Sequence, residues 1–411
     1  TGYKLLMKIN KCRIWKKKKL LKLFSLGNLY FTGKFPSLNQ KIKKKPIELV
    51  ICKDCELVQL GRNFDLKYLY GPDYGYRTGI NKTMLNHVKS VVKYVSQKVK
   101  IKKDDQVLDI ASNDGSLLKF YNKNIVTFGI DPVLDKYKNE FKKINFKISK
   151  FFSANEILKK TKKKFKVITA LSVFYDSLDP NKFIKDVKKI LDNDGIFLLE
   201  FADLASIVKN KMFDTICHEH LEYYSSKVIV NLCKQNDLKV FDIKSNDING
   251  ASKQYYICNF NSKYKVNKTR INKVLINEKK LKLSNKKTFE IFIKSIDDSK
   301  KKLVTLLKRL KKNNKNTHCY GASTKGNVLL QYYKIDHKLI DAVAERNKNK
   351  YNLYTPGTKI KIISETLSRA KNPDYYLVLP WHFKKEILMR EKKIRKQGTK
   401  FIFPLPKLKI I

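Results

Sequence analysis

The alternation of short apolar runs with helical patterns over residues 85–245 most constrains how this chain can fold. Five runs, at residues 106–110, 126–130, 167–171, 196–201 and 240–243, have the length and composition of buried strands. Strands that alternate with helices usually form a parallel sheet covered by helices on both faces. The pattern therefore predicts a doubly wound α/β domain in the middle of the chain.

A similar alternation restarts near residue 318. Strands are expected at 318–322, 339–343, 375–379 and 401–403, and helices at 326–333 and 383–396. Residues 267–316 are rich in lysine, have leucines at helical spacing and predict a long amphipathic connecting helix. The first 65 or so residues lack a long periodic helix and suggest a small module. We therefore predict three domains, at residues 1–68, 69–248 and 249–411, and we find no short internal repeat.

The formal charge of +52 on 411 residues would ordinarily favour a nucleic acid or an anionic membrane as partner. The lysines are spread over every segment, however, and are not gathered with aromatic residues on one stretch. We interpret the charge as a compositional bias and expect no nucleic-acid partner. Because no run approaches about 18 apolar residues and no secretory signal precedes the first module, we expect no membrane span and a cytoplasmic protein. Seven cysteines, an odd number, do not suggest a disulfide framework.

The turn after the expected strand at 106–110 is acidic and has a single glycine. Asp109 ends the strand, and Asp114 precedes Gly115. Ligands of open α/β sheets bind at the carboxyl ends of the strands, and acidic groups there repel a pyrophosphate but attract a sulfonium and an ammonium group. Asp131, at the end of the next strand, can accept hydrogen bonds from both ribose hydroxyls. These features favour S-adenosylmethionine as the ligand, with an ordinary turn and capping acids as the alternative.

A second polar group, Cys-His-Glu-His, occupies residues 217–220. His218 and His220 flank Glu219, and the spacing is not that of the H-E-x-x-H zinc motif because Glu222 stands where the second histidine would be. In an extended segment the two histidines would share one face. Histidine is suited to proton abstraction near neutral pH, although a structural pair bonded to backbone groups is also possible.

Residues 320–327, Tyr-Gly-Ala-Ser-Thr-Lys-Gly-Asn, lie between an expected strand and an expected helix. Small residues with a serine, a threonine and a lysine at a helix N-terminus form a good anion-binding turn. The spacing is not that of a nucleoside triphosphatase loop. The turn therefore favours a phosphorylated substrate.

Cys52 and Cys55 have the spacing of a zinc half-site or a redox dithiol, or the pair arises by chance. Nothing around the pair suggests a thioredoxin-like unit. A structural zinc site needs four ligands, and Cys12 is a plausible third. Trp15, three residues after Cys12, cannot be the fourth.

In their order along the chain, these motifs resemble those of the bacterial sugar C-methyltransferases, which act on nucleotide-linked 4-keto-deoxysugars. The similar segments are 52–60, 74–79, 108–118, 217–220, 250–252, 320–327, 354–358, 379–383 and 403–406, and together they span nearly the whole chain. The resemblance implies a class I, Rossmann-like S-adenosylmethionine-dependent methyltransferase domain. A small zinc-binding-like module would precede it, and a C-terminal α/β domain that binds the nucleotide sugar would follow.

The resemblance also implies a reaction in which the C3 hydrogen next to a C4 ketone is removed, so that the enolate carbon can take the methyl group. Such a reaction needs a base and a group that stabilises the oxyanion. By resemblance His220 is the candidate base, Glu219 orients the substrate or the base, and Tyr76 places a hydroxyl near the sugar; His218 is a further catalytic candidate. The other candidates are Asp109, Ala111, Asn113, Asp114, Gly115 and Asp131 for the cofactor, Tyr224, Ser252, Tyr320, Ser323, Lys325 and Asn327 for the substrate, and Cys12, Cys52 and Cys55 for zinc.

The chain departs from the family's pattern at two positions. Cys217 stands where many relatives have a tyrosine, and Trp15 stands where the family has a cysteine, so the zinc site is incomplete. Two other classes of function stay open. The charge favours an RNA or DNA methyltransferase, although the chain lacks an aromatic target-base motif, and the two departures would suit a binding protein that kept the fold but lost the chemistry.

Overall fold

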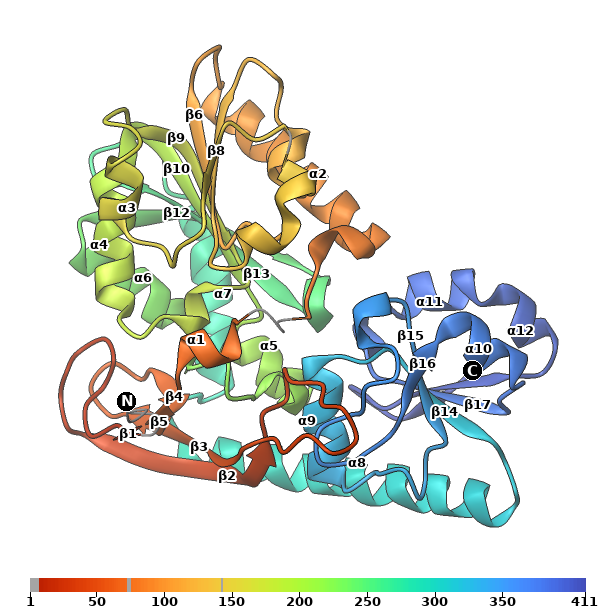
Figure 1. The fold of residues 1–411 in the computed structure, drawn as a ribbon. Helices are drawn as coiled ribbons and strands as arrows, with labels where there is room; N and C mark the ends of the chain where they lie inside the picture. The colour runs from red at the N-terminus through yellow and green to blue at the C-terminus, as the bar shows by residue number, and fades with distance from the viewer. Residues whose placement is uncertain (1–6, 72–74, 142) are drawn as a thin grey trace.

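The computed structural model describes residues 7–71, 75–141 and 143–411 (Figure 1). Three bodies meet in it. The central sheet lies at the top of the view, the N-terminal strands at the lower left, and the C-terminal sheet at the right (Figure 1). The long helix α8 (Lys286–Lys312) runs along the bottom from the N-terminal strands to the C-terminal domain.

The central domain is built on a seven-stranded sheet in the order β12-β13-β10-β9-β6-β7-β8. The strands are β6 (Gln106–Ile110), β7 (Val126–Ile130), β8 (Phe146–Ile148), β9 (Phe165–Leu171), β10 (Leu191–Phe201), β12 (Leu238–Asn246) and β13 (Ser252–Asn259). Strands β6 to β10 are parallel, and β13 is antiparallel to both of its neighbours. This is the class I, Rossmann-like arrangement, and the predicted fold class is confirmed.

Both faces of this sheet are covered, which explains why its strands are continuous apolar runs. Val107 packs on one face against the valines of α2 (Lys82–Val99), whereas Leu108 packs on the other. The second face is covered by α3 (Ala154–Leu158), α4 (Pro180–Ile190) and α6 (Ser226–Gln235). Successive strand residues point to opposite faces, so one short run serves two cores. Pro180 at the first position of α4 and the Asp179 side chain, which accepts from Lys182 N, fix where that helix begins.

Two strands of the central sheet, and a break in the helical segment that follows it, were not predicted. β8 is short and partly exposed, and β13 lies beyond the predicted domain boundary at residue 248, so that boundary cuts an antiparallel strand pair. The single long helix expected at 267–316 is wrong: it is divided into α7 (Lys268–Lys280) and α8. Lys282 has a left-handed backbone (φ 49°), and the Asn285 side chain caps the start of α8 by accepting from Lys287 N. The break lets α7 pack on β12 and α8 on β2.

The C-terminal domain has a six-stranded sheet in the order β16-β15-β14-β17-β18-β19. Its elements are β14 (Thr317–Tyr320), α9 (Thr324–Tyr333), β15 (Ala342–Glu345), β16 (Ile362–Ser364), α10 (Glu365–Ala370), β17 (Tyr375–Val378), α11 (Lys384–Arg390), α12 (Lys392–Lys396), β18 (Lys400–Phe403) and β19 (Lys409–Ile410). β14 to β18 are parallel, and β19 is an antiparallel edge strand. The predicted second α/β unit is present, with β16 and α10 in addition.

The N-terminal module does not stand alone. Its sheet has the order β11-β4-β3-β2, formed by β2 (Leu20–Tyr30), β3 (Lys44–Cys52), β4 (Val58–Leu60) and β11 (Glu222–Tyr223), the last from the central part of the chain. β1 (Met7–Lys8) pairs with β5 (Arg62–Asn63), and the short helix α1 (Leu66–Leu69) follows. Phe24 of β2 packs against Phe289 and Phe292 of α8, with ring centroids 6.1 and 5.9 Å away. One apolar core therefore runs from this sheet into the C-terminal domain.

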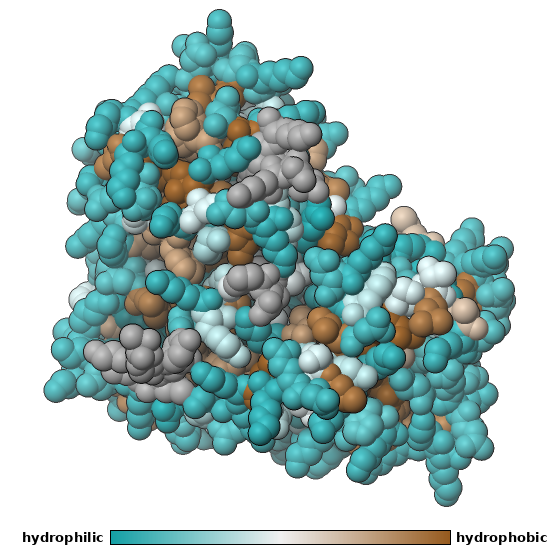
Figure 2. Space-filling view, in the orientation of Figure 1, coloured by the Kyte–Doolittle hydropathy of each residue, from teal (hydrophilic) through white to brown (hydrophobic). Residues whose placement is uncertain are grey.

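Hydrophilic side chains cover most of the surface seen in Figure 2, with apolar side chains in smaller groups between them. Within the described ranges, no helix combines the length and the apolar character that crossing a bilayer requires.

Candidate active site

A cavity of about 1040 Å³ lies where the three bodies meet. Residues that follow β6, β9 and β14 line it, together with the linker around Tyr76 and the residues Glu219 and His220. Since the carboxyl ends of parallel strands are where open α/β sheets bind ligands, two such edges share this cavity.

The turn after β6 has an unusual backbone that places its amides at this edge. Ala111 (φ 58°) and Asn113 (φ 50°) are left-handed although neither is glycine, and Gly115 (φ 71°) completes the turn. Ala111 N donates to Ile130 O at 2.8 Å, and Asn113 N donates to the Asp131 carboxylate at 3.0 Å. Left-handed residues other than glycine are costly and are concentrated at ligand-binding sites.

Two carboxylates at this edge line the cavity. The Asp109 carboxylate accepts from Thr169 Oγ1 at 2.6 Å, and burial raises the pKa of Asp109 to about 7. Asp131 accepts from Val133 N at 2.8 Å, and burial raises the pKa of its carboxyl as well. A cationic ligand would draw both groups toward the ionised form, because an opposite charge nearby favours it.

Asp114 and Gly115, which the sequence suggested for the cofactor, do not line the cavity. The Asp114 carboxylate accepts from Gly79 N at 2.8 Å and from Ser116 Oγ at 2.7 Å, and it pairs with Arg77 at 3.3 Å. A Cβ at Gly79 would lie 2.6 Å from the Asp114 oxygen, so glycine is needed there. Asp114 therefore holds the linker against the turn.

The linker carries Tyr76 into the cavity. The Tyr76 carbonyl accepts from Asn113 Nδ2 at 3.2 Å, and Asn113 Oδ1 accepts from Thr78 N at 3.0 Å. The Tyr76 side chain is 47% exposed and lines the cavity, and the surrounding protein raises the pKa of its hydroxyl. The neighbouring Tyr74 of the same motif lies outside the described residues.

His220 has its ring fixed by one strong hydrogen bond. Its Nδ1 lies 2.6 Å from the carbonyl oxygen of Thr215, at the end of the 3-10 turn Phe213–Thr215. A carbonyl can only accept, so Nδ1 carries the proton and Nε2 has a free lone pair. Burial lowers the pKa of His220 to about 3, and the ring lines the cavity. His220 is therefore a neutral base at physiological pH.

Glu219 connects the N-terminal module to the cavity. Its carboxylate accepts from Gly33 N at 3.0 Å and from Thr32 Oγ1 at 3.3 Å, and burial raises its pKa. A Cβ at Gly33 would meet the Glu219 carboxylate, so a larger residue there would displace the Glu219 side chain.

His218 does not fit the predicted catalytic role. Its ring lies 4.6 Å from Phe31 and 5.0 Å from Phe64, centroid to centroid, and its Nε2 bonds to Lys45 O at 3.1 Å. Burial lowers its pKa to about 4, and it does not line the cavity. The expectation that His218 and His220 share a face is wrong because residues 217–220 form a turn, with His220 N donating to Cys217 O, and not an extended segment.

The turn after β14 brings three of the four predicted residues to the cavity. Tyr320, Ser323 and Lys325 line it, but Ser323 Oγ caps α9 by accepting from Gly326 N at 3.0 Å. Lys325 Nζ donates to Asn249 O at 3.0 Å. Asn327 does not line the cavity, because its amide donates to Thr32 O at 2.7 Å and so ties α9 to the N-terminal module.

Two other predicted substrate residues also lie elsewhere. Tyr224 is fully buried and stacks on Phe174 with ring centroids 4.9 Å apart, and Ser252 Oγ donates to Ile248 O at 2.9 Å. Neither lines the cavity. Both residues are buried in the protein interior.

Sequence reasoning missed several residues of the cavity wall. Ser172, Tyr175 and Asp176 follow β9, Arg346 and Lys350 follow β15, and Arg390 lies on α11; Asn249 and His382 also contribute. The rule that ligands bind at the carboxyl ends of parallel strands pointed to the first five. The same rule pointed to His382, which follows β17 within the motif at 379–383, whereas the sequence offers no comparable signal for Asn249 or Arg390.

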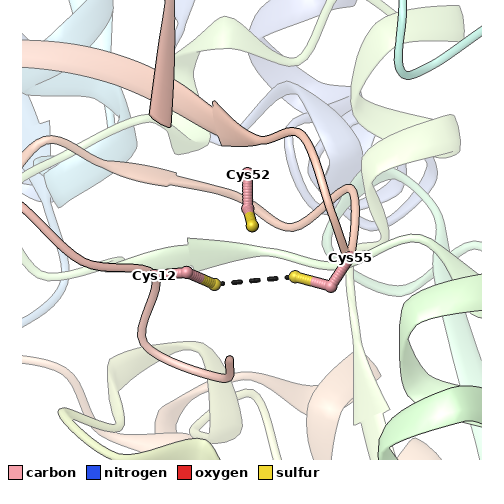
Figure 3. Close-up of side chains that lie close together, drawn as sticks. All are labelled: Cys12, Cys52 and Cys55. Carbon is pink, nitrogen blue, oxygen red and sulfur yellow. Dashed lines mark hydrogen bonds between the residues drawn. The ribbon is translucent and has the colours of Figure 1, made fainter. Parts of the chain in front are cut away.

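Three cysteine thiols converge in the N-terminal module, and Figure 3 shows them pointing toward one another. The sulfur atoms of Cys12, Cys52 and Cys55 lie within 4.8 Å of one another, and those of Cys12 and Cys55 are 3.5 Å apart. Cys12 and Cys52 begin matching turns, in which the carbonyl of each accepts from the amide four residues on. Trp15, where the first turn would need a fourth thiol, is 42% exposed.

These residues supply three of the four ligands of a closed structural zinc site. They fit a three-thiolate site with one open position, and zinc binding stays a prediction.

The sequence is similar to those of known methyltransferases. The sequence model of a family described as "Methyltransferase domain" matches residues 80–243, and that of "C-methyltransferase C-terminal domain" matches residues 247–406. C-methyltransferase NovU of Streptomyces niveus is 24% identical over 369 residues, which are 89% of this chain and 87% of NovU.

Other similarities cover less of the chain. A tRNA U34 carboxymethyltransferase of Campylobacter jejuni is 28% identical over 191 residues, 43% of this chain and 62% of its own length. A solved S-adenosylmethionine-dependent methyltransferase from Clostridium acetobutylicum is 14% identical with a TM-score of 0.35, and the match covers 42% of this chain and 91% of that one.

Proposed function

Because this chain belongs to the C-methyltransferase family and is an S-adenosylmethionine-dependent methyltransferase, we propose that it methylates C3 of a nucleotide-linked 4-keto-deoxysugar. The observation that carries this proposal is His220, a neutral imidazole that lines the shared cavity and whose proton-bearing Nδ1 is bound to Thr215 O, which leaves the Nε2 lone pair as the basic site. Carbon methylation needs such a base, because the carbon becomes a nucleophile only when it loses a proton.

The acidic edge of the central sheet suits the cofactor. Asp131 follows β7 and can accept from ribose hydroxyls, and Asp109 is a carboxylate toward which a cationic methionine group would be drawn. S-adenosylmethionine supplies an electrophilic methyl group when it is bound. The protein's task is then to hold the methyl carbon about 3–3.5 Å from the sugar carbon.

The opposite wall suits a phosphorylated sugar. Arg346, Lys350 and Arg390 line it beside the N-terminus of α9, and Lys325 adds a further amine. Helix N-termini and guanidinium groups are favourable partners of a diphosphate. Ligand pockets usually measure about 300–1000 Å³, so a cavity of about 1040 Å³ has room for a cofactor and a nucleotide sugar together.

The direct test is product analysis. Purified protein is incubated with methyl-labelled S-adenosylmethionine and a panel of dTDP-, UDP-, CDP- and GDP-linked 4-keto-6-deoxyhexoses, and the products are examined by mass spectrometry and NMR. The proposal expects one added methyl group on the sugar, at C3. Tritium or deuterium exchange at C3 without methylation would indicate an intact base but a wrong acceptor or donor.

Two outcomes would contradict the proposal. Label transferred to tRNA or DNA, with none on any sugar, would favour the nucleic-acid methyltransferase. If the protein binds the cofactor and a nucleotide sugar but catalyses neither C3 hydrogen exchange nor methyl transfer, it is a binding protein without catalytic activity.

A further inference from the structure

By the resemblance to the sugar C-methyltransferases, Cys217 stands where a tyrosine is expected, so this position supplies no phenol here. Cys217 is fully buried and does not line the cavity. An enolate nonetheless needs a hydrogen-bond donor at its oxygen, because negative charge develops there in the transition state. Another hydroxyl of the cavity wall near His220 would have to supply this hydrogen bond.

Tyr175 lies beside the base. It follows β9, lines the cavity, and has its ring centroid 4.2 Å from that of His220 at an interplanar angle of 54°. Its backbone carbonyl accepts from Leu221 N at 2.7 Å, immediately after His220. The 3-10 turn Phe174–Asp176, which follows β9, and the histidine turn are thereby joined, and this bond helps to set the relative position of the phenol and the imidazole.

Two polar side chains accompany Tyr175 in the cavity wall. Asn249 Nδ2 donates to Ser172 Oγ at 3.2 Å, and Ser172, three residues before Tyr175, lines the cavity together with Asn249 and Tyr175. Burial holds the pKa of Tyr175 well above its ordinary value, so the phenol keeps its proton. A protonated phenol can donate that proton to a ligand oxygen.

The backbone is strained at both supporting residues. Ser172 has φ 57° and Asn249 has φ 56°, left-handed conformations that residues with a Cβ seldom adopt. Lys325 Nζ holds Asn249 in place by donating to Asn249 O at 3.0 Å. Ser172 follows β9 and Asn249 lies in the turn before β13, and their side chains are in contact. Backbone strain at both residues indicates that their contact has a role in the site.

We propose that Tyr175 is the oxyanion donor of the reaction, in place of the tyrosine that the resemblance predicts at position 217. Ser172 and Asn249 are its positioning residues. His220 Nε2 takes the C3 proton, the C–H electron pair forms the C3=C4 bond, and the C4 oxygen becomes an oxyanion that accepts from Tyr175. The enolate carbon then forms a bond to the methyl carbon as the sulfur–carbon bond breaks. The ketone re-forms, the sulfonium becomes a thioether, and the proton on His220 passes to water. This inference rests on the proposed function.

The test compares Tyr175→Phe with the wild type and with Tyr121→Phe. Tyr121 is a matched control because its buried hydroxyl has no hydrogen-bond partner and it does not line the cavity. Two rates are measured on the substrate that the wild type accepts: methyl transfer, and exchange of the C3 hydrogen with deuterium oxide in the presence of S-adenosylhomocysteine. Tyr175→Phe should lose about 10²–10³-fold in both, as other enzymes do when one oxyanion donor is removed. Tyr121→Phe should lose less than about threefold.

Asn249→Gly tests the positioning residues separately. Glycine accepts the left-handed backbone without strain and keeps the carbonyl that Lys325 contacts, but it removes the amide donor. We expect about a tenfold loss in kcat with KM unchanged, a split that a merely structural role would not give. Binding of S-adenosylhomocysteine, measured by calorimetry, should equal that of the wild type in all three variants.

The outcomes separate this inference from the function it rests on. If the wild type methylates no keto sugar, the proposed function fails. If the wild type is active and Tyr175→Phe stays within about threefold of it, the function stands and the role of Tyr175 is refuted. A Tyr175→Phe protein that loses cofactor binding as well would show a structural role and would also overturn the inference.

Discussion

The edges of the central and C-terminal sheets that meet at the cavity share a hydrogen-bond pattern but differ in their charged side chains. After β6, Ala111 N donates to Ile130 O at 2.8 Å, and Asn113 N donates to the carboxylate that ends the next strand. After β14, Gly321 N donates to Ala344 O at 2.8 Å, and Ala322 N donates to the carboxylate of Glu345, which ends the next strand. The chain thus builds one strand–turn–strand arrangement twice, without a visible sequence repeat.

The side chains around the two turns differ. The central edge presents Asp109 and Asp131, whereas the C-terminal edge combines Lys325, Arg346 and Lys350 with the carboxylates of Glu345, Glu365 and Glu386. On the proposed function, the acidic central edge would bind the cationic cofactor, and the lysines and the arginine of the C-terminal edge would bind the anionic nucleotide sugar. The candidate base belongs to neither sheet, because His220 lies in the turn at residues 217–220, just before β11 of the N-terminal sheet.

The largest effect is expected at this shared position. His220→Ala should lower kcat/KM about 10³-fold because general base catalysis is lost, while binding at both edges stays within about twofold. Product formation and two calorimetric titrations, with S-adenosylhomocysteine and with UDP-glucose, measure this. His337→Ala is the matched control, because His337 also bonds to a backbone carbonyl but does not line the cavity. Lost binding at either edge would make His220 a structural residue.

The second effect should appear at the central edge alone. Asp131→Ala removes the acceptor for the ribose hydroxyls and should weaken S-adenosylhomocysteine binding about 30-fold, or about 2 kcal/mol, the usual value of hydrogen bonds to a charged group. Binding of UDP-glucose should not change. An equal loss of affinity for S-adenosylhomocysteine and for UDP-glucose would mean that the central and C-terminal edges do not bind their ligands independently.

The third effect is a pH dependence of the central edge. Asp109 has a pKa raised to about 7, so it is largely protonated at pH 6 and ionised at pH 8. A cation prefers the ionised form, so the affinity for S-adenosylmethionine should rise about tenfold from pH 6 to pH 8 and level off above that. Calorimetry over this range measures it, and Asp109→Asn should flatten the curve. A curve unchanged by the substitution would exclude Asp109 as the titrating group.

The smallest effect is expected at the C-terminal edge. Arg346→Ala removes one partly exposed charge, whose Nη2 lies 3.7 Å from Glu386, and should weaken UDP-glucose binding about fivefold, or about 1 kcal/mol. The difference from the wild type should shrink at high salt, because ions screen exposed charges. An effect on S-adenosylhomocysteine instead would reverse the assignment of the two edges.

Much of the fold was accessible from the sequence where burial is complete. β6 and β7 begin and end at the predicted residues, since strands covered on both faces must be apolar throughout. β8 was missed because it is three residues long and partly exposed, and the break at Lys282 was missed because lysine and asparagine also occur within helices. The predicted site residues divided between the cavity and the core. Motif residues such as His220 and Lys325 reached the cavity, whereas His218 and Tyr224 joined the core.

The sequence by itself determined the α/β class, the acidic turn after the first central strand and the order of the family's motifs, because each depends on residues adjacent along the chain. The tertiary structure decided which of those residues share the cavity, since Tyr175, Asn249 and Arg346 come from different elements. It also brought the thiol of Cys12 to those of Cys52 and Cys55. Local spacing fixes the face of a strand or a helix, but only the packing of strands and turns fixes distances between segments far apart in the chain.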